Sequence, residues 1–134
     1  MAPIPNQVIL CVDDDELILT SLEMQLKEHL GDTYLYEFAE NADDALEILD
    51  ELETDGYNTL LVISDWLMPG LKGDNLLIKI HQKFPKVVKV MLTGQADQEA
   101  IERSKSEANL FACLAKPWST SDLINTIKRG LSTI

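Results

Sequence analysis

Short apolar runs alternate with helical patterns along the chain. Five mostly apolar runs span residues 8–12, 34–38, 59–64, 87–92 and 110–115. The first is continuously apolar, as in a parallel strand that is covered on both faces. After each run, apolar residues recur three or four positions apart, which predicts an amphipathic helix. This alternation predicts an α/β fold with a five-stranded parallel sheet and helices on both faces.

The predicted helices have recognisable ends. They are expected from about residue 17 to 30, from about 41 to near 56, between 73 and 84, from 96 to about 108, and from 119 or 120 to 129. Glycines follow the first two helices and Pro85 follows the third, as is typical where helices stop. The fourth helix has only a weak apolar stripe. We expect one domain over residues 1–134, with a flexible tail at 1–6.

The amino-acid composition excludes several classes of protein. The 134 residues are 46% hydrophobic and 25% charged, which fits one globular domain. Eleven basic and 23 acidic residues give a net charge of −12, which disfavours direct contact with nucleic acid or an anionic membrane surface. No apolar stretch approaches the roughly 18 to 20 residues of a membrane span. Cys11 and Cys113 lie in apolar runs, which indicates reduced, buried thiols and a cytoplasmic location.

Polar side chains follow four of the predicted strands. Asp13 and Asp14 follow the first strand, Asp65 the third, Thr93 the fourth and Lys116 the fifth. Functional residues of open parallel sheets lie beyond the carboxyl ends of the strands. If the first and third strands are neighbours, their carboxylates converge and repel one another, and Mg²⁺ is the hard cation that best neutralises them. The lysine and the threonine hydroxyl suit a phosphoryl group, and the nucleophile would be a carboxylate.

Four motifs at these strand ends resemble the receiver domain of bacterial two-component response regulators, and the resemblance covers nearly the whole chain. They are Val12-Asp13-Asp14, Asp65-Trp66-Leu67-Met68-Pro69-Gly70, Thr93-Gly94 and Lys116-Pro117. The resemblance implies a flavodoxin-like, doubly wound sheet of strand order 2-1-3-4-5, which alternation alone leaves open. It also implies a signalling domain rather than an enzyme, in which a cis Lys116-Pro117 peptide bond is common.

The resemblance implies a Mg²⁺ site and a phosphoacceptor. Asp65 would accept a phosphoryl group from a sensor histidine kinase or a phosphotransfer protein. Asp14, Asp65 and the backbone carbonyl of Leu67 would bind Mg²⁺ directly, whereas Asp13 would act mostly through water.

The remaining two residues would bind the phosphoryl group itself. Lys116 would pair with the phosphoryl oxygens, and the hydroxyl of Thr93 would hydrogen-bond one of them. The domain would assist its own phosphorylation and dephosphorylation, and it would switch conformation to control an output domain or an effector protein.

One position departs from the family pattern. Cys113 stands three residues before the lysine, where the family commonly has an aromatic residue whose rotamer reports phosphorylation. Phe111, or a shift of the helix at 96–108, would then carry the signal. Relatives most often signal through this helix, the strand at 110–115 and the last helix, so we expect a partner or homodimer interface there.

Two alternatives stay open at this level. A haloacid-dehalogenase-like phosphatase would use Asp13 as nucleophile and Asp15 as acid/base, with Thr93 and Lys116 in its second and third motifs. That family needs a further acidic pair after the lysine, where only Asp122 follows. A non-phosphorylated pseudo-receiver scaffold is the second alternative, although such domains usually lose a key residue.

Overall fold

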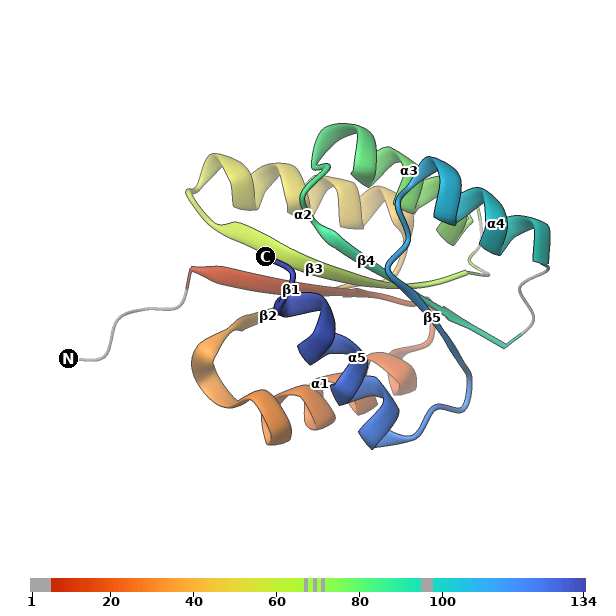
Figure 1. The fold of residues 1–134 in the computed structure, drawn as a ribbon. Helices are drawn as coiled ribbons and strands as arrows, with labels where there is room; N and C mark the ends of the chain where they lie inside the picture. The colour runs from red at the N-terminus through yellow and green to blue at the C-terminus, as the bar shows by residue number, and fades with distance from the viewer. Residues whose placement is uncertain (1–5, 67, 69, 71, 95–97) are drawn as a thin grey trace.

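The sheet has the strand order that the resemblance implies. The computed structural model of the protein describes residues 6–66, 68, 70, 72–94 and 98–134 (Figure 1). Within these residues, five parallel strands form one sheet in the order β2-β1-β3-β4-β5. The strands are β1 (Gln7–Val12), β2 (Leu35–Ala39), β3 (Asn58–Asp65), β4 (Val88–Thr93) and β5 (Ala112–Ala115). The predicted α/β fold and the order 2-1-3-4-5 are confirmed.

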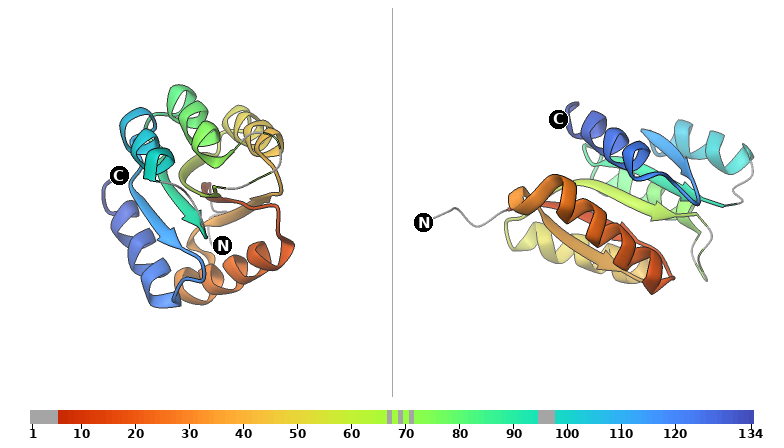
Figure 2. Two further views of the ribbon diagram at one scale, coloured as in Figure 1. Left: turned by 90° about the vertical axis from the view of Figure 1, so that its right-hand side faces the viewer. Right: turned by 90° about the horizontal axis from the view of Figure 1, so that it is seen from below.

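Helices cover both faces of the sheet. The described part of the chain forms α1 (Glu16–Leu30), α2 (Ala42–Thr54), α3 (Gly73–Lys83), α4 (Gln98–Glu107) and α5 (Thr120–Leu131), with a 3₁₀ turn at Gly31–Thr33. Helices α2, α3 and α4 lie on one face and α1 and α5 on the other (Figures 1 and 2). None of the described helices combines the length and the apolarity that crossing a bilayer requires.

The continuously apolar run of β1 is explained by burial on both sides. In β1, Ile9 and Cys11 face the α1 and α5 layer, whereas Leu10 and Val12 face the α2 and α3 layer. All four side chains are fully buried. Each buried Leu or Ile contributes about 1.5–3 kcal/mol, so both layers are held by apolar contact with the sheet. Of the two thiols predicted to be buried, Cys11 is buried and Cys113 is half-buried.

Side-chain caps fix where the helices near the strand ends begin. Asp15 Oδ1 accepts the N–H of Leu17 at 2.9 Å at the start of α1, and Ser119 Oγ accepts the N–H of Asp122 at 3.1 Å at the start of α5. Such caps typically contribute about 1 kcal/mol. Helix α1 therefore starts immediately after the acidic residues that follow β1, and residues 116–119 form the short loop between β5 and α5.

Some element boundaries differ from the prediction. Strand β2 begins at Leu35 rather than at residue 34, because Tyr34 is the C-cap residue of the 3₁₀ turn at Gly31–Thr33. Strand β5 begins at Ala112 rather than at residue 110, since the N–H of Leu110 donates to the Ser104 carbonyl of α4 and not to β4. The expected tail and the expected first residues of the fourth helix lie mostly outside the described residues, which omit 1–5 and 95–97.

Candidate functional site

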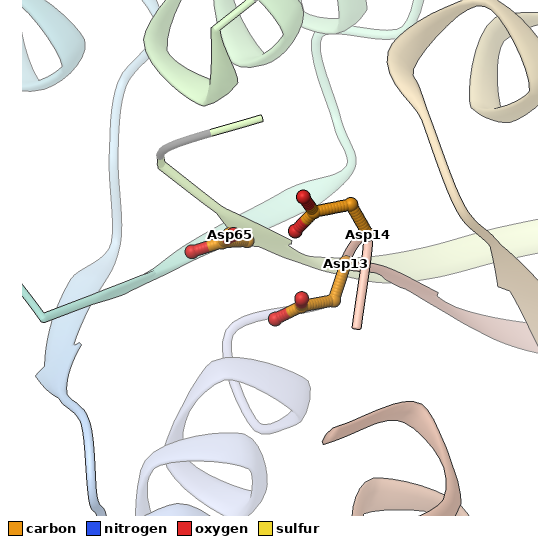
Figure 3. Close-up of side chains that lie close together, drawn as sticks. All are labelled: Asp13, Asp14 and Asp65. Atoms are coloured by element: carbon orange, nitrogen blue, oxygen red, sulfur yellow. The ribbon is translucent and has the colours of Figure 1, made fainter. Parts of the chain in front are cut away.

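Three carboxylates converge at the carboxyl ends of β1 and β3. Asp13 and Asp14 follow β1, and Asp65 is the last residue of β3 (Figure 3). The two strands are paired neighbours, with Val12 opposite Ser64. One oxygen atom from each of the three carboxylates lies within 4.8 Å of the others. Asp13 and Asp65 are buried and Asp14 is exposed. The geometry can hold a small cation with one side open to solvent.

Both oxygens of Asp13 accept hydrogen bonds from the protein. Oδ1 accepts the backbone N–H of Asp15 at 2.9 Å, and Oδ2 accepts from Lys116 Nζ at 2.7 Å. Because a carboxylate that accepts several hydrogen bonds is held in one orientation, Asp13 is a fixed anion at the base of the cluster. Its oxygens are less available to a cation than those of the exposed Asp14.

Lys116, which follows β5, also contacts the cluster. Its ammonium nitrogen lies 2.7 Å from Asp13 Oδ2 and 2.9 Å from Asp65 Oδ1, and its side chain is 21% exposed. The backbone N–H of Lys116 donates to the carbonyl of Thr93 at 2.9 Å, which fixes the start of the loop on β4. One ammonium group thus lies against two of the three carboxylates.

The electrostatics of the cluster favour a further cation. Burial raises the pKa of Asp65, and the charges of Asp13 and Asp14 raise it further, while Lys116 opposes both. Burial by itself lowers the pKa of Lys116, but the hydrogen bonds and charges of Asp13 and Asp65 outweigh it and raise that pKa. Three carboxylates face one ammonium group, so the cluster keeps an excess of negative charge that a divalent ion would offset.

The structure describes some but not all of the other residues expected at this edge of the sheet. Thr93 is the last residue of β4, pairs with Ala115 of β5 and is half-buried, so its hydroxyl-bearing side chain belongs to the same edge of the sheet. Leu67, whose backbone carbonyl was expected as a metal ligand, lies outside the described residues. The Lys116-Pro117 peptide bond is cis, as the resemblance implies. Cys113 lies within β5 opposite Met91.

One hydrogen bond next to the site could not be predicted from the sequence. Trp118 Nε1, in the loop that carries Lys116, donates to Gln25 Oε1 of α1 at 2.9 Å. A glutamine between helical leucines matches no motif, and its partner is 93 positions away. Only the packing of α1 against α5 brings the two residues together.

Comparisons with known proteins agree with this geometry. The sequence model of the response regulator receiver domain family matches residues 9–128. The chain is 26% identical to the hydrogenase transcriptional regulatory protein HoxA of Cupriavidus necator over 94% of its own length, but it spans only 24% of that regulator. The signal receiver domain of an HD domain-containing protein from Pseudomonas fluorescens Pf-5 is 31% identical, with a TM-score of 0.85 and 96% of each chain covered. A CheY-like response regulator receiver domain protein from Methanospirillum hungatei is also 31% identical, with a TM-score of 0.82, covering 95% of this chain and 94% of the other.

These findings do not favour the two alternatives. The phosphatase would need Asp15 as acid/base, yet the Asp15 carboxylate caps α1. The pseudo-receiver would have lost a key residue, yet the acidic residues, the threonine and the lysine of the four motifs are all present. Phosphorylation and Mg²⁺ binding are typical of the family that matches. The chain therefore belongs to the response regulator receiver domain family.

Proposed function

We propose that Asp65 accepts a phosphoryl group and that the chain is a phosphorylation-dependent switch. The observation that carries this proposal is the 2.9 Å contact between Lys116 Nζ and Asp65 Oδ1. A fixed ammonium group beside a buried carboxylate can offset the charge of an incoming phosphoryl group. Asp65 is a better acceptor than Asp13, because both oxygens of Asp13 already accept hydrogen bonds.

The proposed step is a simple phosphoryl exchange. A carboxylate oxygen of Asp65 bonds to phosphorus while the phosphorus–nitrogen bond of a phosphohistidine breaks, and the donor imidazole keeps that electron pair and takes up a proton. Lys116 offsets charge on the phosphoryl oxygens, and Thr93 supplies a hydroxyl donor. In the later hydrolysis step, water attacks the phosphorus while its bond to the Asp65 oxygen breaks, which releases phosphate and the Asp65 carboxylate. The domain assists both steps by positioning these groups.

The carboxylate cluster fits Mg²⁺. The ion prefers oxygen ligands, keeps several waters and binds one or two carboxylates together with a phosphate oxygen. Asp14 and Asp65 would be the direct ligands, joined by the Leu67 carbonyl, and Asp13 would act through water because its oxygens are engaged. When bound, Mg²⁺ would offset the charge shared by the carboxylates and the phosphoryl oxygens.

The phosphoryl donor would dock on α1. Leu17 is 79% exposed and Met24 is 67% exposed. The two residues are seven positions apart, so they lie on one side of the helix, and Leu17 is in the turn next to the acidic cluster. Exposed apolar side chains on one helix face suit the helix of a partner. A sensor histidine kinase or a phosphotransfer protein would present its phosphohistidine to Asp65 from this side.

Phosphorylation would act on the α4, β5 and α5 side. A phosphoryl group adds roughly 1.5 to 2 negative charges, which can shift an existing conformational equilibrium. We propose that this shift controls an output domain or effector protein in the cytoplasm, through a partner or homodimer contact on α4, β5 and α5. The net charge of −12 argues against direct contact with nucleic acid.

Intact mass spectrometry tests the proposed function. After incubation with acetyl phosphate and Mg²⁺, the unaltered protein should gain one phosphoryl group, and a chelator should prevent the gain. The Asp65→Asn variant should gain none, whereas Asp43→Asn, an exposed acid in the first turn of α2, should behave as the unaltered protein. An equal adduct on Asp65→Asn, or an adduct mapped to Asp13, would contradict the proposal. Because some receivers do not accept small donors, binding of Mg²⁺ and beryllofluoride is the second measurement.

A further inference from the structure

One hydrogen bond joins the two segments that supply opposite charges to the site. Helix α1 begins directly after Asp13 and Asp14, and the loop at 116–119 supplies Lys116. Between them, the indole N–H of Trp118 donates to Gln25 Oε1 at 2.9 Å. Within the described residues, no other side-chain hydrogen bond joins α1 to this loop.

The geometry of this bond is fixed from both sides. The Gln25 amide nitrogen donates to Ser21 Oγ at 3.0 Å, which turns the amide oxygen toward the indole. The Trp118 ring is half-buried and packs against the apolar layer between the sheet, α1 and α5. Both partners are partly buried, where a hydrogen bond is more stable than in water.

The bond limits where the Lys116 backbone can lie. On one side of Lys116, its own N–H donates to the Thr93 carbonyl at 2.9 Å. Two residues further along the chain, Trp118 is tied to α1. The lysine is therefore anchored before and after its ammonium group reaches Asp13 and Asp65. Catalytic groups are commonly held in this way by neighbours that do not touch the reactants.

We infer that Gln25 and Trp118 are positioning residues that hold the Lys116 ammonium group against Asp13 and Asp65. The inference rests on the proposed function of this site. With the bond removed, the ammonium group holds the two carboxylates less firmly, so a competing Mg²⁺ ion binds more tightly. The same loosening leaves charge on the incoming phosphoryl group less well offset, so phosphorylation slows.

Mg²⁺ affinity, measured by calorimetry, is the first readout, because it does not depend on phosphorylation. Trp118→Phe keeps an aromatic ring and removes the donor, and Gln25→Met removes the acceptor at similar length. Each should bind Mg²⁺ about threefold to tenfold more tightly than the unaltered protein and take up phosphoryl groups more slowly by a similar factor. Gln25→Glu keeps an acceptor oxygen and should stay close to the unaltered protein in both measurements.

A matched control and a double variant separate positioning from general destabilisation. Tyr36→Phe removes a hydrogen bond of similar burial, from Tyr36 to the Gly31 carbonyl at 2.8 Å at the far end of α1, and should change neither readout. Trp118→Phe should have no further effect on Mg²⁺ affinity when Lys116 is already methionine. An equal effect with and without Lys116 would overturn the inference, as would unchanged Mg²⁺ affinity in both single variants. Absence of Mg²⁺ binding and phosphorylation in the unaltered protein would instead contradict the proposed function.

Discussion

Lys116 Nζ and Asp65 Oδ1 form an ion pair of 2.9 Å at the carboxyl edge of the sheet. The ammonium group offsets part of the charge that a metal ion would otherwise meet at the same carboxylate. The lysine and the metal ion therefore compete for the same carboxylates when the site is unphosphorylated. Once a phosphoryl group is present, both offset its negative charge.

Replacing Lys116 with methionine should raise the affinity for Mg²⁺. Removing one positive charge in contact with two carboxylates should tighten binding about tenfold, given the partial exposure of the lysine. The same variant should be phosphorylated far more slowly. Calorimetry measures the first effect and intact mass the second, with Lys105→Met on exposed α4 as the control. Weaker Mg²⁺ binding by Lys116→Met would show that the lysine and the ion do not compete.

Lys89 should make stability depend on alkaline pH. Its side chain is 1% exposed within β4, and burial lowers its pKa from the ordinary 10.5 to about 8. Below pH 8 both folded and unfolded chains carry the charge, so the full cost of burying it is present. Between about 8 and 10.5 the unfolded chain binds more protons, so the contribution of Lys89 to stability rises with pH.

The Lys89→Met variant isolates this effect. At pH 7 it should be more stable than the unaltered protein by about 1–3 kcal/mol, because a well-packed apolar side chain replaces a buried charge. The difference should shrink as pH rises from 8 toward 10.5. Urea unfolding at pH 7, 9 and 10.5 measures it, and Lys79→Met on the exposed side of α3 is the control. A difference that is constant or grows with pH would contradict the expected sign.

Arg103 should hold α4 against α3. Its Nη1 donates to Asn75 Oδ1 at 2.8 Å and lies 3.4 Å from Asp74 Oδ2, and Nε donates to Glu107 at 2.8 Å. The buried face of α4 is made of small side chains such as Ala100, so apolar contact holds this helix weakly.

Arg103→Ala should therefore loosen α4 selectively. Hydrogen exchange of the α4 amides should become faster by about fivefold, since the lost contacts are worth roughly 1 kcal/mol at a half-exposed arginine. Exchange in α1 should not change, and Lys105→Ala on the same helix should leave α4 as it is. Equal protection of α4 in Arg103→Ala and in the unaltered protein would mean that other contacts fix the helix.

Replacing Leu17 should slow phosphoryl transfer from protein donors but not from small-molecule donors. Leu17→Ser removes the exposed apolar side chain nearest to the acidic cluster, and should slow transfer from a phosphohistidine-bearing protein by about tenfold, as loss of an interface anchor does. Phosphorylation by acetyl phosphate should not change, because that donor needs no docking surface. Ile134→Ser alters another exposed apolar residue, 63% exposed, and is the control. Equal slowing with both donors would place the effect in the site itself.

The convergence of the acidic residues could be predicted because parallel strands bring their carboxyl ends to one edge. Alternation could not supply the strand order, which depends on long-range pairing such as that of β1 with β3. Lys89 interrupts an apolar run and carries no sign of burial, yet its Nζ folds back onto the Val87 carbonyl within the core. The Gln25–Trp118 bond likewise arises only when α1 packs beside α5. Local sequence patterns indicate which face of an element is apolar, but they do not indicate which side chains distant in the sequence will be in contact.

The carboxylate of Asp13 has a consequence for which substitutions this stretch tolerates. Its Oδ1 accepts the N–H of Asp15, the residue that caps α1, while its Oδ2 accepts from Lys116. Asparagine at position 13 keeps an oxygen for the turn but loses the charge and the second oxygen, which accepts from Lys116, whereas alanine removes both oxygens. The same carboxylate therefore supports the start of α1 and supplies charge to the site. Asp13→Ala would lose both, so comparison of the two variants separates an effect on folding from an effect on chemistry.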